Sequence, residues 1–320
     1  MSCDKYVTDA KGLRSTLDEF GVAIIPEVLD AAECEALVDG FWDFFQTISA
    51  GWAKPLNRGD QSSWRGFFDL IPLHGMLFQH WGIGHSDFVW KLRQNRKLIA
   101  PFEELWGVRA EDLLVSFDGA SFSAPSEITN RGWHRGVYGL HVDQPFDNSD
   151  FQCVQSWVTG LDVNEGDATL IVLEGSHKVH RKFAEECGKT DIKEWYKLTE
   201  EEQGWYDAQG CQKVRMVCPK GSMVFWDSRT IHCGAEPLKG RAAPNFRAVV
   251  YLCYTPRKLA TAANLKKKQK AFNEGRMTTH WPHKVKLFPK TPRTYGKDLP
   301  EIEEYEKPEL SQLGKKLAGF

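Results

Sequence analysis

The chain has 320 residues, 42% of them hydrophobic, and a formal net charge of −2. This length allows one large or two average domains with a sizeable core, and the near-neutral charge indicates no particular charged partner. The eight cysteines are scattered without a Cys-x-x-Cys pair, a pattern that disfavours a disulfide framework or a zinc site.

The sequence carries no recognisable targeting signal. No apolar run approaches the ~18 residues of a membrane span, and the N-terminus lacks a signal-peptide pattern. The last residues are Leu-Ala-Gly-Phe320 rather than a peroxisomal tripeptide of the Ser-Lys-Leu type. We therefore expect a cytoplasmic protein.

The first 112 residues are expected to be mainly helical. Residues 31–47 place apolar side chains at helical spacing after Asp30, which is suited to capping a helix. Residues 86–106 predict two short helices broken at Pro101. Residues 113–117 are strand-like and lead into a turn at Asp-Gly.

A loop-like stretch rich in Ser, Gly, Arg and Asn covers residues 118–136. It is a candidate substrate lid, in which Asn130, Arg131 and Arg135 could contact an anionic substrate. Solvated loop residues are the favoured interpretation of these three side chains.

The extended stretch 137–143 contains the first candidate metal ligands, His141 and Asp143. Successive strand side chains point to opposite faces, so these two share a face with about 7 Å between their Cα atoms. Both can then reach one metal ion. The alternative is an ordinary histidine beside a turn aspartate, since a His-x-Asp tripeptide also arises by chance.

The best candidate for a third ligand is His232. It ends the mostly apolar run 221–232, in which alternation puts Val224, Trp226 and His232 on one face. A satisfied core histidine is the competing interpretation. Three other histidines are weaker candidates because they lie in loop or turn sequence: His134, His177 and His180.

The apolar strand pattern 245–254 contains Arg247, on the same face as Val249 and Tyr251. An arginine that points into a core must be paired, because an isolated buried charge is prohibitively costly. Its partner is either a structural Asp or Glu or a bound anion. Arg241 is the alternative arginine, but its polar loop suits solvent better than a buried site.

These four side chains favour one kind of chemistry. Two imidazoles and one carboxylate cover one face of an iron(II) ion and leave positions open for a co-substrate and O2. A downstream arginine supplies a fork for a carboxylate. His141, Asp143, His232 and Arg247 together favour a non-haem iron oxygenase that uses 2-oxoglutarate.

Several segments, in order, resemble the phytanoyl-CoA dioxygenase-like family of iron(II)/2-oxoglutarate oxygenases. Leu-His-Val-Asp at 140–143 is similar to the family's first metal motif, Gln-Ser-Trp at 155–157 to the next strand, and 167–178 to an apolar strand ending in a Gly-Ser-His turn. Residues 221–232 and 245–251 resemble the family's strands that carry the second histidine and the arginine. Residues 17–26 resemble the family's opening helix and strand. The resemblance covers residues 15–255 with gaps and specifies no substrate.

The resemblance implies a β-rich α+β fold built on a double-stranded β-helix, the jelly-roll core of cupin-like proteins. We expect one dioxygenase domain over residues 1–320. Its jelly-roll core would cover about 113–255, flanked by N-terminal helical support at 1–112 and a basic C-terminal extension at 256–320.

The resemblance also implies the site residues. Iron(II) would be held by His141, Asp143 and His232, and 2-oxoglutarate by the iron and Arg247, with O2 as the second co-substrate. Trp157 stands where the family places an aromatic residue beside the co-substrate, with an ordinary core tryptophan as the alternative. Halogenating relatives replace the carboxylate with a small residue, so Asp143 favours hydroxylation or oxidative demethylation.

Gly234 departs from the family pattern, which has a polar residue two positions after the distal histidine. The contacts to the co-substrate carboxylate would then be less complete, with Thr255 or Tyr251 in compensation. The spacing from His232 to Arg247 is also longer than usual.

The C-terminal part differs in composition from the rest. Residues 257–297 contain twelve Lys or Arg against one acid, Glu274, and include the run Lys266–Lys270. This stretch could bind a nucleic acid, with Trp281, Phe288 and Tyr295 as stacking groups. The favoured interpretation is a helix with a solvated lysine face and an extended tail packed on the barrel.

Three functions are compatible with these features. The first is iron(II)- and 2-oxoglutarate-dependent hydroxylation or demethylation of a small molecule. The second is the same chemistry on a nucleic acid or protein docked by the basic segment, and the third is a non-catalytic jelly-roll binding protein. The substrate is not identified by the sequence, because one fold hosts many substrates.

Overall fold

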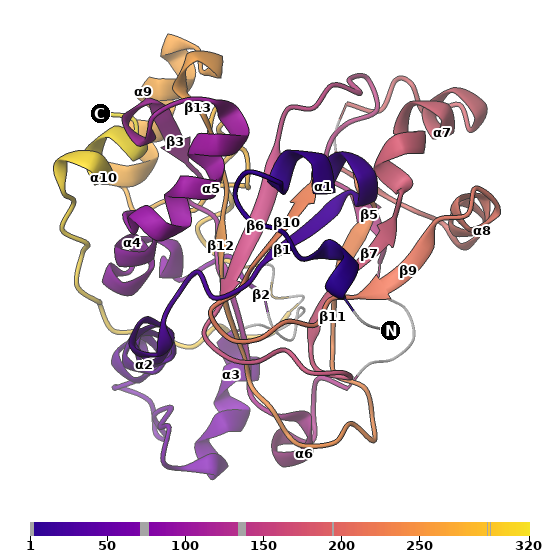
Figure 1. Cartoon of the computed structure of the whole chain (residues 1–320). Coiled ribbons are helices and arrows are strands. Elements are labelled where there is room, and N and C mark those ends of the chain that lie inside the picture. Colours follow the sequence, from indigo (N-terminus) through magenta and orange to yellow (C-terminus); the bar gives the residue numbers. More distant parts are fainter. Residues whose placement is uncertain (1–2, 71–76, 134–138, 194, 293, 295) are drawn as a thin grey trace.

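The computed structural model describes residues 3–70, 77–133, 139–193, 195–292, 294 and 296–320 (Figure 1). Three of the candidate residues, His134, Arg135 and Tyr295, lie outside these ranges. No helix in the described ranges is long and apolar enough to cross a membrane.

Two antiparallel sheets form a jelly roll, as the resemblance implies. The larger has the strand order β1-β10-β6-β12-β4-β2 and the smaller β8-β5-β11-β7-β9, while β3 and β13 form a separate pair. The strands of the larger sheet are β1 (Val22–Ile25), β2 (Leu77–Phe78), β4 (Ala120–Ser123), β6 (Val154–Thr159), β10 (Met223–Asp227) and β12 (Arg247–Leu252). Those of the smaller sheet are β5 (His141–Val142), β7 (Thr169–Glu174), β8 (Tyr196–Lys197), β9 (Gln212–Arg215) and β11 (His232–Ala235), and the pair is β3 (Leu113–Val115) and β13 (Tyr254–Pro256).

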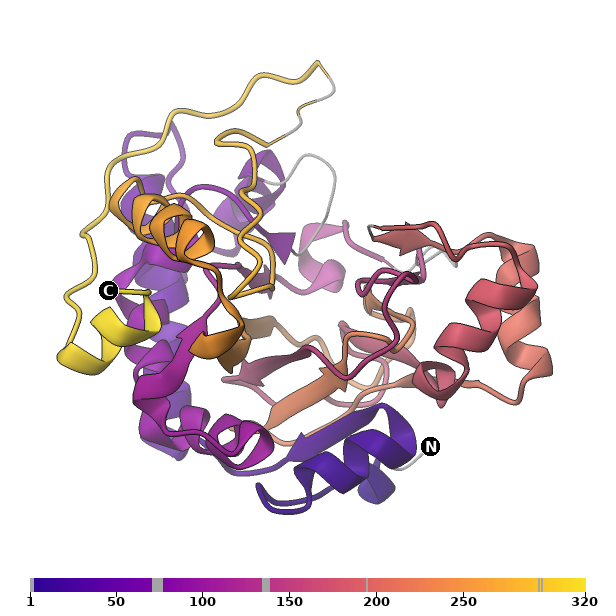
Figure 2. The same cartoon turned by 90° about the horizontal axis from the view of Figure 1, so that it is seen from above.

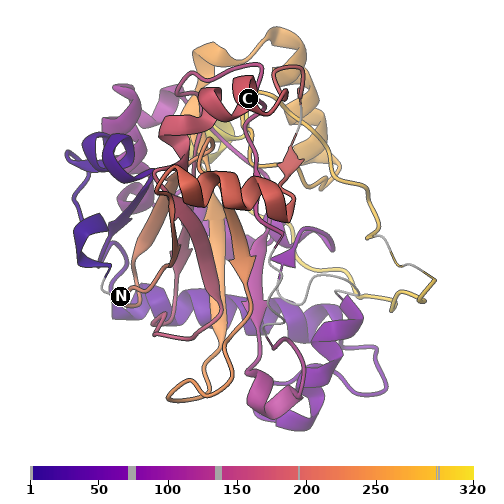
Figure 3. The same cartoon turned by 90° about the vertical axis from the view of Figure 1, so that its right-hand side faces the viewer.

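Helices cover the outer faces of both sheets. Figure 1 shows α2, α4 and α5 on one side of the strands and α7 and α8 on the other, and Figures 2 and 3 show the same arrangement from above and from the side. The α-helices are α1 (Leu13–Phe20), α2 (Ala31–Ile48), α3 (Phe67–Leu70), α4 (Asp87–Arg93), α5 (Arg96–Trp106), α6 (Ser126–Thr129), α7 (His180–Glu186), α8 (Glu200–Ala208), α9 (Ala262–Asn273) and α10 (Gln312–Leu317). Short 3-10 helices occur at η1 (Asp4–Tyr6), η2 (Gln61–Gly66), η3 (Ile83–His85), η4 (Ala110–Asp112), η5 (Ser176–Val179) and η6 (Arg257–Leu259).

Strand alternation divides the core of the larger sheet into two layers. On β10, Val224 and Trp226 belong to the cluster between the sheets, which also contains side chains of β7 and β9. Their neighbours Met223 and Phe225 belong to the outer cluster, with side chains of α2 and α5. The inner layer is the one that faces the strands with the candidate metal ligands, because Trp226 lies 5.4 Å from His232 between ring centroids.

Helix α2 begins where its sequence indicates. The Asp30 side chain accepts a hydrogen bond from the Glu33 backbone N–H, and the Glu33 side chain accepts one from the Asp30 backbone N–H, which is a capping box.

The helix break expected at Pro101 is wrong, because Pro101 lies inside α5. The chain breaks earlier, where the Asn95 side chain caps α5 by accepting a hydrogen bond from the Lys97 N–H.

The run 221–232 is not one strand, contrary to the expectation from its alternation. It contains β10 in the larger sheet and the start of β11 in the smaller one. The Asp227 carboxylate binds the Arg229 backbone N–H and guanidinium, and the Thr230 N–H donates to the Asp227 carbonyl. This turn carries the chain from one sheet to the other, so His232 begins a strand rather than ending one.

The basic C-terminal segment packs on the body of the protein. Lys268 of α9 is fully buried, donates a hydrogen bond to the Val115 carbonyl and lies 3.8 Å from the Phe117 ring centroid. Burial, followed by the nearby Arg93, lowers the pKa of Lys268 well below its ordinary range. The run Lys266–Lys270 is therefore not an uninterrupted solvated lysine face, and Trp281 is buried instead of being free to stack.

Candidate metal centre

Two adjacent strands bring His141, Asp143 and His232 together. His141 of β5 and His232 of β11 are direct partners in the antiparallel register, and Asp143 follows β5. Asp143 Oδ1 lies 3.7 Å from His141 Nε2, and Asp143 Oδ2 lies 3.3 Å from His232 Nε2. One ligand atom from each residue lies within 4.8 Å of the other two, which is a spacing that one metal ion can bridge.

Backbone carbonyls orient both imidazoles with Nε2 toward Asp143. His141 Nδ1 lies 3.0 Å from the Gly139 carbonyl oxygen, and His232 Nδ1 lies 2.9 Å from that of Thr230. A carbonyl only accepts, so each Nδ1 carries the proton and each Nε2 offers its lone pair to the centre. Burial, and then the neighbouring His232, lower the pKa of His141 to about 4, which keeps its ring neutral near pH 7.

The Asp143 carboxylate is ionised and held in place. Burial alone would raise its pKa, but His280, His232 and His141 keep the pKa of Asp143 well below its ordinary range. Gln155 of β6 donates a hydrogen bond of 2.8 Å from Nε2 to Asp143 Oδ2. Two imidazoles and one carboxylate fit iron(II), which takes this donor set on one face and keeps other positions open.

Gln155→Leu is expected to weaken iron(II) binding by roughly 10- to 100-fold, because partners that orient a metal ligand have effects of this size. The leucine keeps the volume but leaves Asp143 without its amide donor. Anaerobic calorimetric titration with iron(II) measures the change. Gln152→Leu is the matched control, since Gln152 contacts Lys284 instead of the metal ligands. Equal affinities in the two variants would contradict the assignment of Gln155.

Arg247 is a buried cation that has no carboxylate partner among the described residues. It is 3% exposed, and its Nε and Nη1 donate to the Ser121 hydroxyl at 2.9 Å and the Ala168 carbonyl at 3.1 Å. Among the described residues, other buried or half-buried arginines form ion pairs with Asp or Glu, and Arg247 does not. Because a buried charge needs compensation, this guanidinium fits an anionic ligand.

The separation between Arg247 and the candidate metal ligands matches an extended ligand. His232 pairs with Val172 of β7, and Arg247 contacts Ala168 four residues away, about 13 Å along the strand. Gly234 pairs with Leu170 in this interval and is exposed. Gly234 therefore offers no polar side chain where the family pattern has one.

Trp157 lies beside Arg247, with the guanidinium carbon 5.4 Å from its ring centroid. It is fully buried, and its Nε1 has no hydrogen-bond partner in the described part of the chain. Tyr251 pairs with Trp157 on the neighbouring strand. Thr255 is less suited to assist Arg247, because it lies in the β13–β3 pair and its hydroxyl binds His283 at 3.0 Å.

The other candidate residues have structural partners. His177 Nε2 binds the Asp18 carbonyl, and His180 Nε2 binds that of Gln144. In the lid, Arg131 lies over the Phe68 ring and Asn130 ends α6 in a left-handed conformation. The expectation that Arg241 faces solvent is wrong: its buried side chain forms ion pairs of 2.7 Å with Glu127 and 2.8 Å with Asp167.

Two side chains beside the metal ligands were not found from the sequence. His280 Nδ1 lies 3.8 Å from Asp143 Oδ2, and the Trp195 ring centroid lies 5.4 Å from that of His141. Both residues are distant in sequence from the candidate ligand nearest to them, and neither belongs to a recognised motif. The sequence offers one signal: His280, Trp281 and His283 lie close together in the basic segment. The many lysines and arginines of that segment draw attention away from them.

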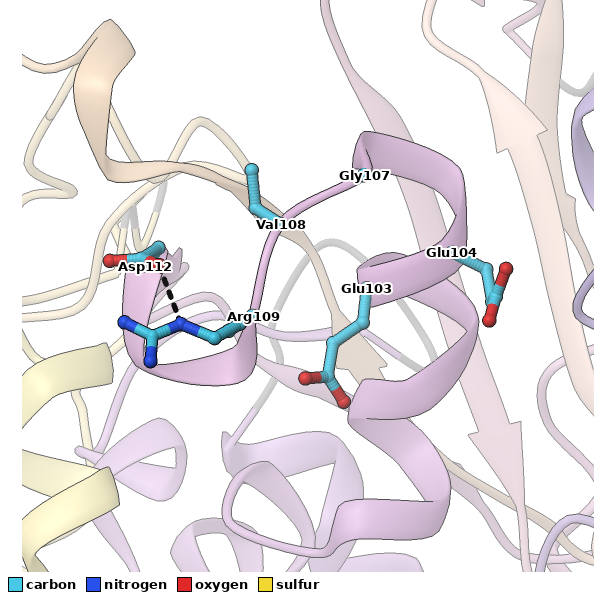
Figure 4. A pocket seen from close by; sticks show the side chains of 6 residues that line it. All are labelled: Glu103, Glu104, Gly107, Val108, Arg109 and Asp112. Atoms are coloured by element: carbon cyan, nitrogen blue, oxygen red, sulfur yellow. Dashed lines mark hydrogen bonds and ion pairs between the residues drawn. The ribbon is translucent and has the colours of Figure 1, made fainter.

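A depression elsewhere on the surface has no connection with this centre. Figure 4 shows it at the end of α5 and at η4, where Arg109 and Asp112 form an ion pair of 3.3 Å. Its lining residues are Glu103, Glu104, Gly107, Val108, Arg109 and Asp112. None of them belongs to the strands that carry the metal ligands, so it is not the substrate site of this centre.

Comparisons with known proteins show the family and the fold that the chain shares. A sequence model of the phytanoyl-CoA dioxygenase family matches residues 17–238. The Ava biosynthesis cluster protein O of Aspergillus versicolor is 26% identical over 282 residues, which are 83% of this chain and 85% of that protein. A hypothetical protein of Escherichia coli aligns with a TM-score of 0.58 at 13% identity, over 98% of this chain and 85% of that one. The GlcNAc inducible gene 2 product of Candida albicans aligns with a TM-score of 0.52 at 16% identity, over 97% and 81%. These two structures share the fold.

Proposed function

The chain belongs to the phytanoyl-CoA dioxygenase family, whose members are iron(II)- and 2-oxoglutarate-dependent oxygenases, and from this premise we propose that it hydroxylates or oxidatively demethylates a small molecule. The observation that carries the proposal is the convergence of His141, Asp143 and His232 within 4.8 Å. Asp143 occupies the position where halogenating relatives have a small residue, so the proposed reaction is not halogenation.

We assign the iron(II) ligands to the Nε2 atoms of His141 and His232 and to the Asp143 carboxylate. When bound, iron(II) supplies, with 2-oxoglutarate and O2, the oxidising chemistry that inserts oxygen at a C–H bond. The carbonyls of Gly139 and Thr230 fix the ring tautomers, and Gln155 fixes the carboxylate. These contacts preorganise the site before the metal arrives.

Arg247 and Trp157 are proposed to hold 2-oxoglutarate. The buried guanidinium would bind the 2-oxoglutarate carboxylate that lies far from the metal. This carboxylate supplies the negative charge that the described residues around Arg247 lack. Trp157 would shield that ion pair from water and offer its unpartnered Nε1–H to the ligand. Water exclusion strengthens the charge interaction, because the effective dielectric constant falls.

A small-molecule substrate is proposed in preference to a nucleic acid. The basic run would have to present a continuous charged face to a phosphate backbone. Lys268 is instead buried in its middle and lies over Phe117. A cytoplasmic location remains a prediction.

Residues 1–320 are proposed to act as one domain. The outer hydrophobic cluster contains Leu13 of α1, Phe41 of α2, Phe225 of β10 and Leu317 of α10. The N-terminal helices, the jelly roll and the C-terminal segment therefore share one core, and no part could be removed without exposing apolar surface.

Anaerobic titration with iron(II) and 2-oxoglutarate tests the proposed function. The metal-to-ligand charge-transfer band of the iron(II)–2-oxoglutarate complex is expected only when both are present, because the 2-oxo acid must chelate the metal. No band under fully reducing conditions would refute the oxygenase function and favour a non-catalytic jelly-roll protein.

A further inference from the structure

We propose that the substrate has a planar aromatic ring system that stacks on Trp195 and a hydrogen-bonding substituent that reaches His280. This inference rests on the proposed function, because it places the substrate beside the iron ligands. It deepens that function by giving the chemical class of the substrate and two residues that select it.

Trp195 presents an exposed indole next to a metal ligand. Trp195 is 54% exposed, although tryptophan is usually well buried. Its ring centroid lies 5.4 Å from that of His141. An exposed large aromatic side chain at the edge of a site offers a flat apolar surface. A planar ring system is the ligand that covers such a surface most completely.

The residues that follow Trp195 are anchored on the protein. Strand β8 pairs with β5, so that Lys197 lies opposite His141. The Tyr196 hydroxyl donates to Glu202 of α8 at 2.7 Å, and Lys189 binds the same carboxylate at 3.0 Å. These contacts anchor the strand that directly follows Trp195, and anchoring of a binding element lowers the entropic cost of binding a ligand.

His280 presents a polar atom on the Asp143 side of the metal centre. Its Nε2 is buried and has no hydrogen-bond partner in the described part of the chain, while its Nδ1 is 3.8 Å from Asp143 Oδ2, beyond hydrogen-bond distance. Buried polar atoms are almost always hydrogen-bonded, so an unpartnered imidazole nitrogen beside a reaction centre indicates a ligand partner. A hydroxyl or carbonyl group of the substrate can supply it.

The backbone around His280 holds this ring in place. The Thr278 N–H donates to the Phe117 carbonyl at 3.0 Å, and the Thr278 hydroxyl accepts from the Phe117 N–H at the same distance. The Thr279 N–H donates to the Lys286 carbonyl. His280 therefore lies on a tethered segment. It is next to Asp143, while Trp195 is next to His141.

Binding of 2-naphthol tests the proposal, with decahydro-2-naphthol as the saturated probe of the same skeleton. The full-length protein is loaded with Mn(II) and 2-oxoglutarate, and paramagnetic broadening of the probe's NMR signals reports binding near the metal. We expect 2-naphthol to bind roughly tenfold more tightly than its saturated counterpart, as ring stacking contributes at this level. Trp195→Ala should remove that preference and Trp195→Phe should keep most of it. Leu259→Ala, at a residue that is 45% exposed on η6, should change nothing.

The polar contact is tested with 2-methylnaphthalene, in which a methyl group replaces the hydroxyl. His280→Ala should weaken 2-naphthol binding several-fold and leave 2-methylnaphthalene unchanged, and His280→Gln should restore the hydroxyl preference. A protein that gives the iron(II)–2-oxoglutarate band but does not broaden 2-naphthol, or broadens it equally in Trp195→Ala, would overturn this inference alone. Absence of the band would overturn the proposed function and this inference with it.

Discussion

Replacing His141 by alanine is expected to abolish the iron(II)–2-oxoglutarate charge-transfer band. The variant loses one of the two imidazole nitrogens that face Asp143 across 3.7 Å and 3.3 Å. Loss of a direct ligand should exceed the roughly 100-fold effect that partners of ligands can have on metal affinity. Anaerobic calorimetry with iron(II), followed by absorbance after addition of 2-oxoglutarate, measures both steps.

His177→Ala is the matched control for this experiment. His177 was a competing ligand on the basis of the sequence, but its Nε2 contacts the Asp18 carbonyl. We expect a normal band in this variant, with lower thermal stability from the lost contact. A band that persists in His141→Ala, or disappears in His177→Ala, would show that the ligand set is wrong.

Arg247→Ala is expected to raise the 2-oxoglutarate concentration needed for the band by roughly 100-fold. Truncating one partner of a buried, hydrogen-bonded charge pair costs about 3 kcal/mol, which corresponds to this factor. Iron(II) affinity in the absence of 2-oxoglutarate should stay unchanged, because Arg247 contacts Ser121 and Ala168 rather than the metal ligands. Titration of 2-oxoglutarate at saturating iron(II) gives the measurement.

Arg241→Ala separates ligand binding from stability. Arg241 is also a buried arginine, but Glu127 and Asp167 neutralise it. Its replacement should lower the unfolding temperature and leave the affinity for 2-oxoglutarate unchanged. If Arg247→Ala also lowers only the unfolding temperature, Arg247 is structural and the 2-oxoglutarate carboxylate binds elsewhere.

The parts of the site that the sequence predicted depend on short-range geometry. His141 and Asp143 are two residues apart, so the pleat of a strand is sufficient to put them on one face. The jelly-roll fold and the family were identified from ordered segments, and the family match over 17–238 confirms that identification. The Asp30 cap also depends on contacts within a few residues.

The parts that failed depend on contacts between distant residues. Alternation along 221–232 gave no sign that the chain changes sheets at Asp227, because the turn is made by a side chain binding its own neighbours. Arg241 looked solvated because its loop is polar, whereas its partner Glu127 lies 114 residues earlier. His280 reaches Asp143 only through the tertiary packing of the C-terminal segment.

The packing of that segment has a consequence for the order of events during synthesis. All three residues of the metal triad and Arg247 precede β13, whereas His280 follows α9. At the usual rates of translation, the ribosome adds the 33 residues from position 248 to His280 in roughly two to seven seconds. The residues proposed to bind the metal and 2-oxoglutarate therefore leave the ribosome before His280, the side chain proposed to contact the polar group of the substrate.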